Sequence, residues 1–107
     1  MEQITAQEYL DKVYGPGIHV VLIYRNEDDL YREAVSQFKL LEHRIYGSRH
    51  IHLWKCCIET PDDAATVQIV RLPQIRFFMN GSEKFSHLGV METEMMLNRI
   101  FIIEERR

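Results

Sequence analysis

Two adjacent cysteines are the residues of this sequence best suited by type to covalent chemistry. Cys56 and Cys57 are the only cysteines in the chain. Neighbouring Cα atoms are about 3.8 Å apart, whereas a disulfide usually requires about 4.4–6.8 Å between them. On a strand the two thiols would also point to opposite faces of the sheet. We therefore predict two separate, buried thiols with a structural role.

Two histidines form the start of a second pattern that could do chemistry. His50 and His52 share one face of a predicted strand with Trp54 and Cys56. A His-x-His pair with a cysteine is a set of ligands that zinc accepts. No further ligand follows at a diagnostic spacing, so we favour histidines at the frayed start of a strand and expect no metal.

The acidic run at residues 27–29 could supply carboxylates for general acid–base catalysis. Acidic residues are also favoured in the first turn of a helix, where they face the positive end of the helix dipole. That structural explanation is sufficient here. The chain has no phosphate-binding loop, zincin motif or nucleophile elbow, and we expect no cofactor.

Length and charge narrow the classes of function. The 107 residues are enough for one domain spanning 1–107, and the net charge is −3 with a pI near 5.9. This acidic balance argues against nucleic acid or anionic lipid as the main partner. No apolar run approaches the roughly 20 residues of a membrane span, and the acidic residues near the start do not fit a secretory signal. We expect a cytoplasmic location.

Apolar periodicity and turn residues predict the element order α-β-α-β-α-β-β-α. The first helix begins with the capping box of Thr5 and Glu8, and Asn26 is expected to cap the second. Thr60 and Pro61 begin a short third helix. The other predicted elements are strands at 19–25, 51–58, 74–79 and 82–88, a hairpin turn at Asn80-Gly81, and a last helix at 93–103.

This order predicts an α/β fold. Helical crossovers in the first half give parallel strands, and the hairpin in the second half adds antiparallel ones. We expect a central mixed sheet of four to five strands with helices on both faces.

The stretch LPQIRFFMNG, together with this order, resembles the thioredoxin fold over nearly the whole chain. Pro73 matches the cis-proline that opens a central strand in that family, Asn80-Gly81 its hairpin, Gly89 its late glycine, and Lys55 a lysine common on its middle strand. The resemblance implies a cis bond before Pro73. It also implies that the backbone of the preceding residue can pair with an extended stretch of a partner chain.

The cysteine pair that defines the family's chemistry is missing. The resemblance places Asp29-Leu30-Tyr31-Arg32 where Cys-x-x-Cys belongs, Ile23 at the family's buried aspartate, and Arg25 at its tryptophan. Thiol–disulfide exchange requires an attacking thiolate, and aspartate cannot form a mixed disulfide. We therefore expect a redox-inactive, non-enzymatic domain.

Our first hypothesis is a protein-binding or chaperone module. It would hold an extended segment of a partner protein beside residues 29–32, which replace the Cys-x-x-Cys motif. Tyr31 is the expected anchor and Arg32 the expected partner of a carboxylate. The predicted contact residues are Asp28, Asp29, Tyr31, Arg32, Leu72, Pro73 and Gln74. Thioredoxin-like groups without the cysteine pair include phosducin-like proteins and hydrogenase accessory factors. The stretch ITAQEYLDKV loosely resembles the phosducin-like pattern, but we assign neither subgroup.

Two alternatives stay open. The chain could be a divergent thiol oxidoreductase or glutathione-dependent protein that uses Cys56 or Cys57. It could instead be a structural subunit of a larger complex, including a homodimer.

Overall fold

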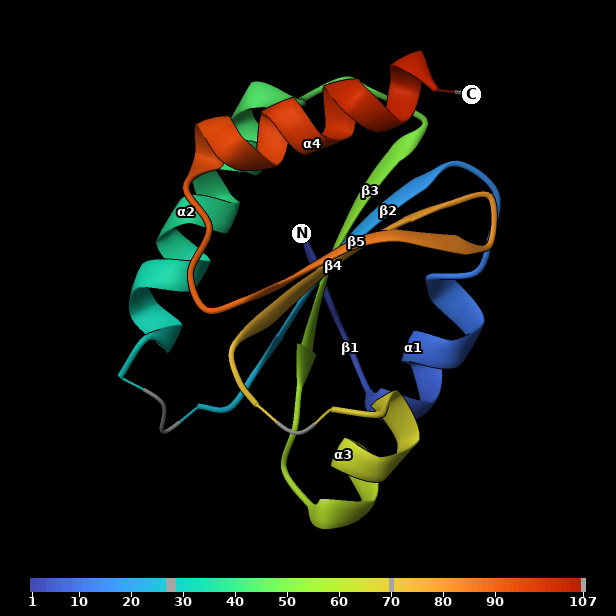
Figure 1. The fold of residues 1–107 in the computed structure, drawn as a ribbon. Coiled ribbons are helices and arrows are strands. Elements are labelled where there is room, and N and C mark those ends of the chain that lie inside the picture. Colours follow the sequence, from blue (N-terminus) through green and yellow to red (C-terminus); the bar gives the residue numbers. More distant parts are fainter. Residues whose placement is uncertain (27–28, 70, 107) are drawn as a thin grey trace.

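The computed structural model describes residues 1–26, 29–69 and 71–106 (Figure 1). These residues form one five-stranded sheet and four helices. Along the chain the elements are β1 (Glu2–Ile4), α1 (Ala6–Lys12), β2 (Ile18–Tyr24), α2 (Tyr31–Arg44), β3 (Ile51–Cys57), α3 (Pro61–Val67), β4 (Gln74–Met79), β5 (Ser82–Leu88) and α4 (Thr93–Glu105). No helix in this described part is long and apolar enough to cross a bilayer.

The sheet is mixed, with the strand order β1-β3-β2-β4-β5. β1, β3 and β2 run parallel, whereas β4 runs antiparallel to both β2 and β5. The predicted hairpin turn is confirmed. Asn80 and Gly81 both have positive φ, at 48° and 85°, as a two-residue turn between twisted strands requires.

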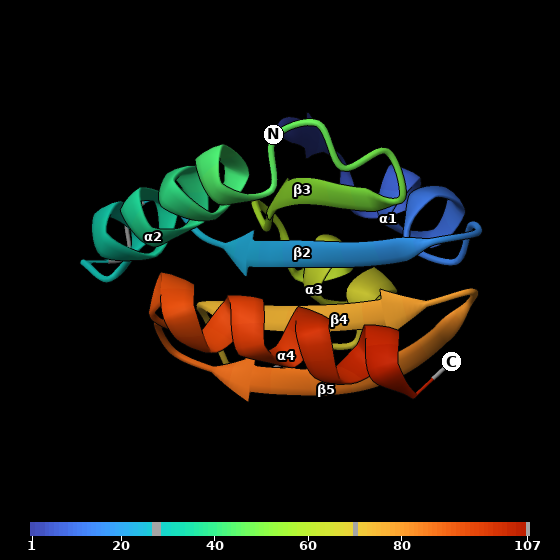
Figure 2. The ribbon, with the colours of Figure 1, turned by 90° about the horizontal axis from the view of Figure 1, so that it is seen from above.

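Helices cover both faces of the sheet, as predicted. α2 and α4 lie on one face, and α1 and α3 on the other (Figure 2). β2 is buried along its whole length, because its alternate side chains enter two different apolar clusters. Val20 and Leu22 pack toward α2 and α4, whereas Val21 and Ile23 pack toward α1 and α3.

Two helix starts agree with the sequence. The Thr5 hydroxyl accepts from the N–H of Glu8 at 3.1 Å, and the Glu8 carboxylate accepts from the N–H of Thr5 at 3.0 Å. The same reciprocal pair joins Thr60 and Asp63 at the start of α3. Each box satisfies backbone donors that the first helical turn leaves unpaired.

The predicted start of the second helix was wrong. Asn26 does not cap it, because α2 begins at Tyr31 and its N-cap residue, Leu30, makes no side-chain cap hydrogen bond. Residues 29–30 form a turn instead of the first helical turn, which leaves Leu30 43% exposed. The acids expected in that turn, Glu27 and Asp28, lie outside the described residues. β1 was not predicted at all, since three residues carry too little periodicity to identify a strand.

Candidate functional site

The segments that carry the candidate residues meet at one end of the sheet. Ile23, near the end of β2, lies opposite Gln74 at the start of β4. The chain therefore leaves β2 toward α2 at the same end where it enters β4 (Figure 1, lower left). This arrangement brings residues 29–32 to the end of the sheet that also holds Leu72 and Pro73. Asp28, the remaining predicted contact, lies outside the described residues.

Three of the residues at the start of α2 are open to solvent. Asp29, Leu30 and Arg32 are all exposed. They lie beside the first helical turn, where backbone N–H groups lack intrahelical partners. This short segment thus presents an acid, an apolar side chain and a base to any molecule that approaches the end of the sheet.

Tyr31 is held more firmly than the sequence suggested. Its ring stacks on that of Tyr24, with centroids 4.6 Å apart and planes inclined by 29°. Tyr24 is buried, and the Lys55 ammonium lies 5.9 Å from its ring centroid. Burial, with smaller contributions from Cys57 and Tyr31, raises the pKa of Tyr24 well above its usual value. Tyr31 is therefore a half-buried platform on the core rather than a free surface anchor.

The segment before β4 offers backbone rather than side chains. The Leu72–Pro73 peptide bond is cis, and the Pro73 carbonyl accepts from the N–H of Gly89 at 2.8 Å. Within the described part of the chain, neither the N–H nor the carbonyl of Leu72 bonds to another backbone group. The Leu72 side chain packs against the cluster under α1 and α3. Its backbone groups are thus the ones available for pairing.

The side chain of Gln74 belongs to the opposite face of the sheet. Its carbonyl oxygen accepts from Nε of Arg76 at 2.8 Å, and Arg76 is directed toward α1 and α3 through Tyr9 and Val67. Gln74 therefore faces away from Tyr31. If it takes part in docking, it does so through its backbone.

Sequence reasoning missed Arg76. Its Nη1 donates to the Tyr9 hydroxyl at 2.8 Å and to the Val67 carbonyl at 2.6 Å, and its Nη2 donates to the Gln68 carbonyl at 2.9 Å. The side chain is only 11% exposed. This one guanidinium holds the end of α3, and with it the start of the loop that leads to Leu72.

Both cysteines lie in apolar surroundings on opposite faces of β3, as predicted. Cys56 is fully buried in the cluster under α1 and α3, and Cys57 is 8% exposed in the cluster under α2 and α4. Burial, followed by the nearby Asp63 carboxylate, raises the pKa of Cys56 to about 12. Burial also raises the pKa of Cys57. Both groups are therefore thiols at neutral pH, and the thiolate is the form that attacks disulfides.

The two histidines considered as metal ligands have different partners. His50 precedes β3 and lies 3.2 Å from the Glu104 carboxylate in α4. His52 stacks on His19 at a centroid distance of 4.7 Å. In the described ranges of the chain, no three histidine, cysteine or acidic side chains come together as a metal site.

His19 occupies a buried position with a defined tautomer. Its Nδ1 accepts from the Trp54 indole N–H at 2.9 Å, so its Nε2 carries the proton and donates to the Pro16 carbonyl at 3.0 Å. Burial lowers the pKa of His19, and the neighbouring His52 adds to that effect while the Pro16 carbonyl opposes it. A second proton on Nδ1 would face the indole donor, so the folded state favours neutral His19.

This arrangement predicts a loss of stability in mild acid. The unfolded chain protonates His19 near its ordinary pKa of 6.5, whereas the folded chain resists that proton. The free energy of unfolding should therefore fall as the pH drops below about 6.5. Urea unfolding at pH 7.5 and pH 5.5, followed by the fluorescence of Trp54, measures the change. His19→Gln keeps a donor and an acceptor and should flatten this dependence, while His43→Gln, at an exposed histidine, should leave it unchanged. An equal pH dependence in His19→Gln would contradict the assignment.

Comparison with known proteins identifies the fold. No protein-family model and no curated protein sequence matches the chain. Its structure is similar to chloroplastic thioredoxin z, with a TM-score of 0.83 at 15% identity over 98% of this chain and 95% of that one. It also resembles Fasciola hepatica thioredoxin (TM-score 0.74, 18% identity, 92% and 95% covered) and Malassezia sympodialis thioredoxin (0.75, 16%, 94% and 88%). The chain therefore has a thioredoxin-like α/β fold.

Proposed function

We propose that this chain is a redox-inactive thioredoxin-like domain that binds another protein as a chaperone or assembly module. The docking surface consists of Asp29, Tyr31 and Arg32 at the start of α2 and of Leu72 and Pro73 before β4. The partner contributes an extended segment that lies between these two parts. No cofactor is needed for this activity.

One observation carries the proposal: the exposed start of α2 holds no thiol, and the thiol of Cys57, which lies at the same end of the sheet beside Tyr24, is buried. Positions 29 and 32 are aspartate and arginine, and both are exposed. The two cysteines of the chain are buried within β3, and their raised pKa values keep them protonated at neutral pH. A domain that exchanged disulfides would need an accessible thiolate instead.

The remaining groups at this end of the sheet suit non-covalent binding. The backbone of Leu72, unpaired within the described part of the chain, offers a donor and an acceptor to an extended peptide. Tyr31, already ordered by its stacking on Tyr24, gives the partner apolar area at a low entropic cost. Arg32 is exposed and can form a two-pronged pair with a carboxylate.

Partner capture tests the surface directly. The double variant Tyr31→Ala/Arg32→Ala should lose the proteins that the immobilised native chain retains, as identified by mass spectrometry. The matched control Tyr46→Ala/Arg49→Ala makes the same two changes at the other end of α2, where Tyr46 is 91% exposed. Circular dichroism should show both variants folded. Equal capture by native chain and the Tyr31→Ala/Arg32→Ala variant would mean that the surface is wrong.

A thiol oxidoreductase is the second candidate, because the solved structures similar to this chain include thioredoxins. It would have to use Cys56 or Cys57. Reduction of insulin disulfides distinguishes the two candidates, since the redox-inactive domain gives no turnover above the dithiothreitol blank. Turnover that disappears in Cys56→Ser or Cys57→Ser would establish the oxidoreductase. Light scattering tests the remaining alternative, self-association into a homodimer.

A further inference from the structure

A cavity of about 660 Å³ lies at the other end of the sheet, between the β4–β5 hairpin and the last turns of α4. The hairpin and the end of α4 lie together on the side opposite the loops that precede α2 and β4 (Figure 1 and Figure 2). The cavity is therefore remote from the proposed docking surface. Its volume falls within the range of about 300–1,000 Å³ that is usual for small-molecule sites.

The floor of this cavity is apolar and belongs to the core. Met79 at the end of β4 and Ile103 in α4 are 8% and 4% exposed. Phe85 and Ile102 continue this surface and are half-buried. Met79 and Ile103 belong to the cluster under α2 and α4, and Phe85 packs against it, so this part of the concave surface exists without rearrangement.

The rim of the cavity is positively charged. Lys84 from β5 and Arg106 after α4 line it, and both are exposed. The Arg99 guanidinium lies just beside it, 5.1 Å from the centroid of the Phe85 ring. Neither aspartate nor glutamate is among the residues described as lining the cavity. The rim of the cavity thus carries cations and no acid among its described lining residues, although the net charge of the whole chain is −3.

These cations are uncompensated, unlike several others in the molecule. Arg44 pairs with Glu94 in α4, and Arg76 lies 3.7 Å from Glu83 in β5. Among the described residues, however, Lys84, Arg99 and Arg106 form no ion pair. The nearby acids Glu83 and Glu104 are directed to Arg76 and His50 instead. The positive potential at the rim is therefore available to a ligand.

We propose that this cavity binds a small organic anion with an apolar body, such as an arylsulfonate or a medium-chain carboxylate. Its acidic group lies between Lys84 and Arg106, where two cations offer charge-assisted hydrogen bonds. Its hydrocarbon part lies against Met79, Phe85 and Ile103. Binding at this site does not depend on the proposed docking surface, since the two lie at opposite ends of the sheet.

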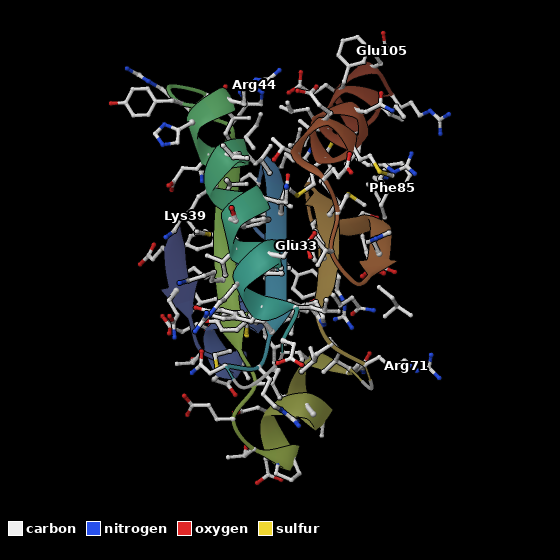
Figure 3. The ribbon with its side chains drawn as sticks, turned by 90° about the vertical axis from the view of Figure 1, so that its left-hand side faces the viewer. Glu33, Lys39, Arg44, Arg71, Phe85 and Glu105 are labelled. Carbon is white, nitrogen blue, oxygen red and sulfur yellow. The ribbon has the colours of Figure 1, made fainter. Side chains whose placement is uncertain are left out.

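Fluorescence titration with 8-anilinonaphthalene-1-sulfonate tests the proposal on the full chain. The native protein should bind this probe with a saturable increase in emission. The charge-reversed variant Lys84→Glu/Arg106→Glu should raise the dissociation constant at least about tenfold, because it removes both charge-assisted hydrogen bonds and places two carboxylates against the acidic group of the probe. The matched control Lys39→Glu/Arg49→Glu makes the same charge change elsewhere and should bind as the native chain does. Figure 3 shows Lys39 and Phe85 on opposite sides of the molecule.

Competition between the probe and a second ligand distinguishes the contribution of the ligand's charge from that of its apolar body. Decanoate should displace the probe, whereas decanol at the same concentration should not. Loosely packed proteins also bind this probe, so a destabilised variant would give a misleading result. If charge reversal lowers the urea midpoint, the milder variant Lys84→Gln/Arg106→Gln is used in its place. The proposal is overturned if the folded variants retain native affinity, or if decanol competes as well as decanoate.

Discussion

Replacing Arg76 with methionine should lower the free energy of unfolding by about 3 kcal/mol. Methionine preserves much of the apolar stem but no donor. The Tyr9 hydroxyl, the Val67 and Gln68 carbonyls and the Gln74 amide oxygen would all lose a hydrogen bond of 2.6–2.9 Å. An acceptor left unpaired in a partly buried site costs about 1–3 kcal/mol, and water can reach some of these acceptors. Urea unfolding monitored by circular dichroism measures the loss.

The loss should be specific to this arginine. Arg71 is an exposed arginine of the loop before β4, and its side chain points away from the body of the protein (Figure 3). Arg71→Met should therefore change stability by no more than about 0.5 kcal/mol. A loss below about 1 kcal/mol in Arg76→Met would show that water replaces the guanidinium at these acceptors.

Arg76 also affects the candidate site, because it binds backbone carbonyls at the start of the loop that leads to Leu72. Gln68 ends α3 in a left-handed conformation, with φ 56° and ψ 58°, which costs a non-glycine residue about 1–2 kcal/mol. Nη2 of Arg76 holds the carbonyl of this same residue. Loss of the guanidinium should thus loosen the loop between α3 and Leu72, and partner capture should weaken along with stability in Arg76→Met.

Local chemistry explains why most of the fold could be predicted from the sequence. A capping box such as that of Thr5 and Glu8 is complete within four residues, and both of its hydrogen bonds are present in the structure. The hairpin turn at Asn80 and Gly81 could be predicted for the same reason, because asparagine and glycine tolerate the positive φ angles that the turn requires. The strand at 74–79 followed from alternation between these signals, and its bounds are those predicted.

Features that depend on distant residues could not be predicted in the same way. In the sequence, Arg76 alternates with the buried residues Ile75 and Phe77, as a surface residue of a strand would. In the structure, however, α1 and α3 place Tyr9 and Val67 against its side chain. The start of α2 was misplaced for a related reason. A favourable local cap at Asn26 was outweighed by a packing register in which the helix begins at Tyr31.

The relative placement of the candidate residues was predicted from the sequence, but the directions of their side chains were not. The strand register brings Leu72 and Pro73 to the end of the sheet where α2 begins, in keeping with the resemblance. Two side chains differ from expectation, however. Tyr31 lies on Tyr24 instead of in solvent, and Gln74 faces Arg76 on the opposite side of the sheet. Stacking and long-range hydrogen bonds set both directions, and neither is visible in a local pattern.

Introducing the missing cysteines should convert this scaffold from inactive to active. In Asp29→Cys/Arg32→Cys the first thiol precedes α2 and the second lies in its first turn, so the helix dipole and nearby N–H groups stabilise a thiolate. Lowering a thiol pKa from about 8.5 to about 7 raises its thiolate fraction at pH 7 from about 3% to about 50%, roughly sixteenfold. We therefore expect insulin reduction by the double variant with dithiothreitol, at a rate clearly above the native chain.

The position of the pair, rather than the mere presence of two thiols, should determine this activity. The control Leu40→Cys/His43→Cys places cysteines at the same spacing in the same helix, at exposed positions in its last two turns. There the dipole opposes a thiolate, and Leu72 is at the other end of the sheet. If the Asp29→Cys/Arg32→Cys pair forms its disulfide yet reduces insulin no faster than this control, the start of α2 and the Leu72 backbone do not form a docking surface. Activity in Asp29→Cys/Arg32→Cys but not in the control would mean that this end of the sheet accepts an extended polypeptide. The native chain would then lack only the two reactive thiols, because Asp29 and Arg32 occupy their positions.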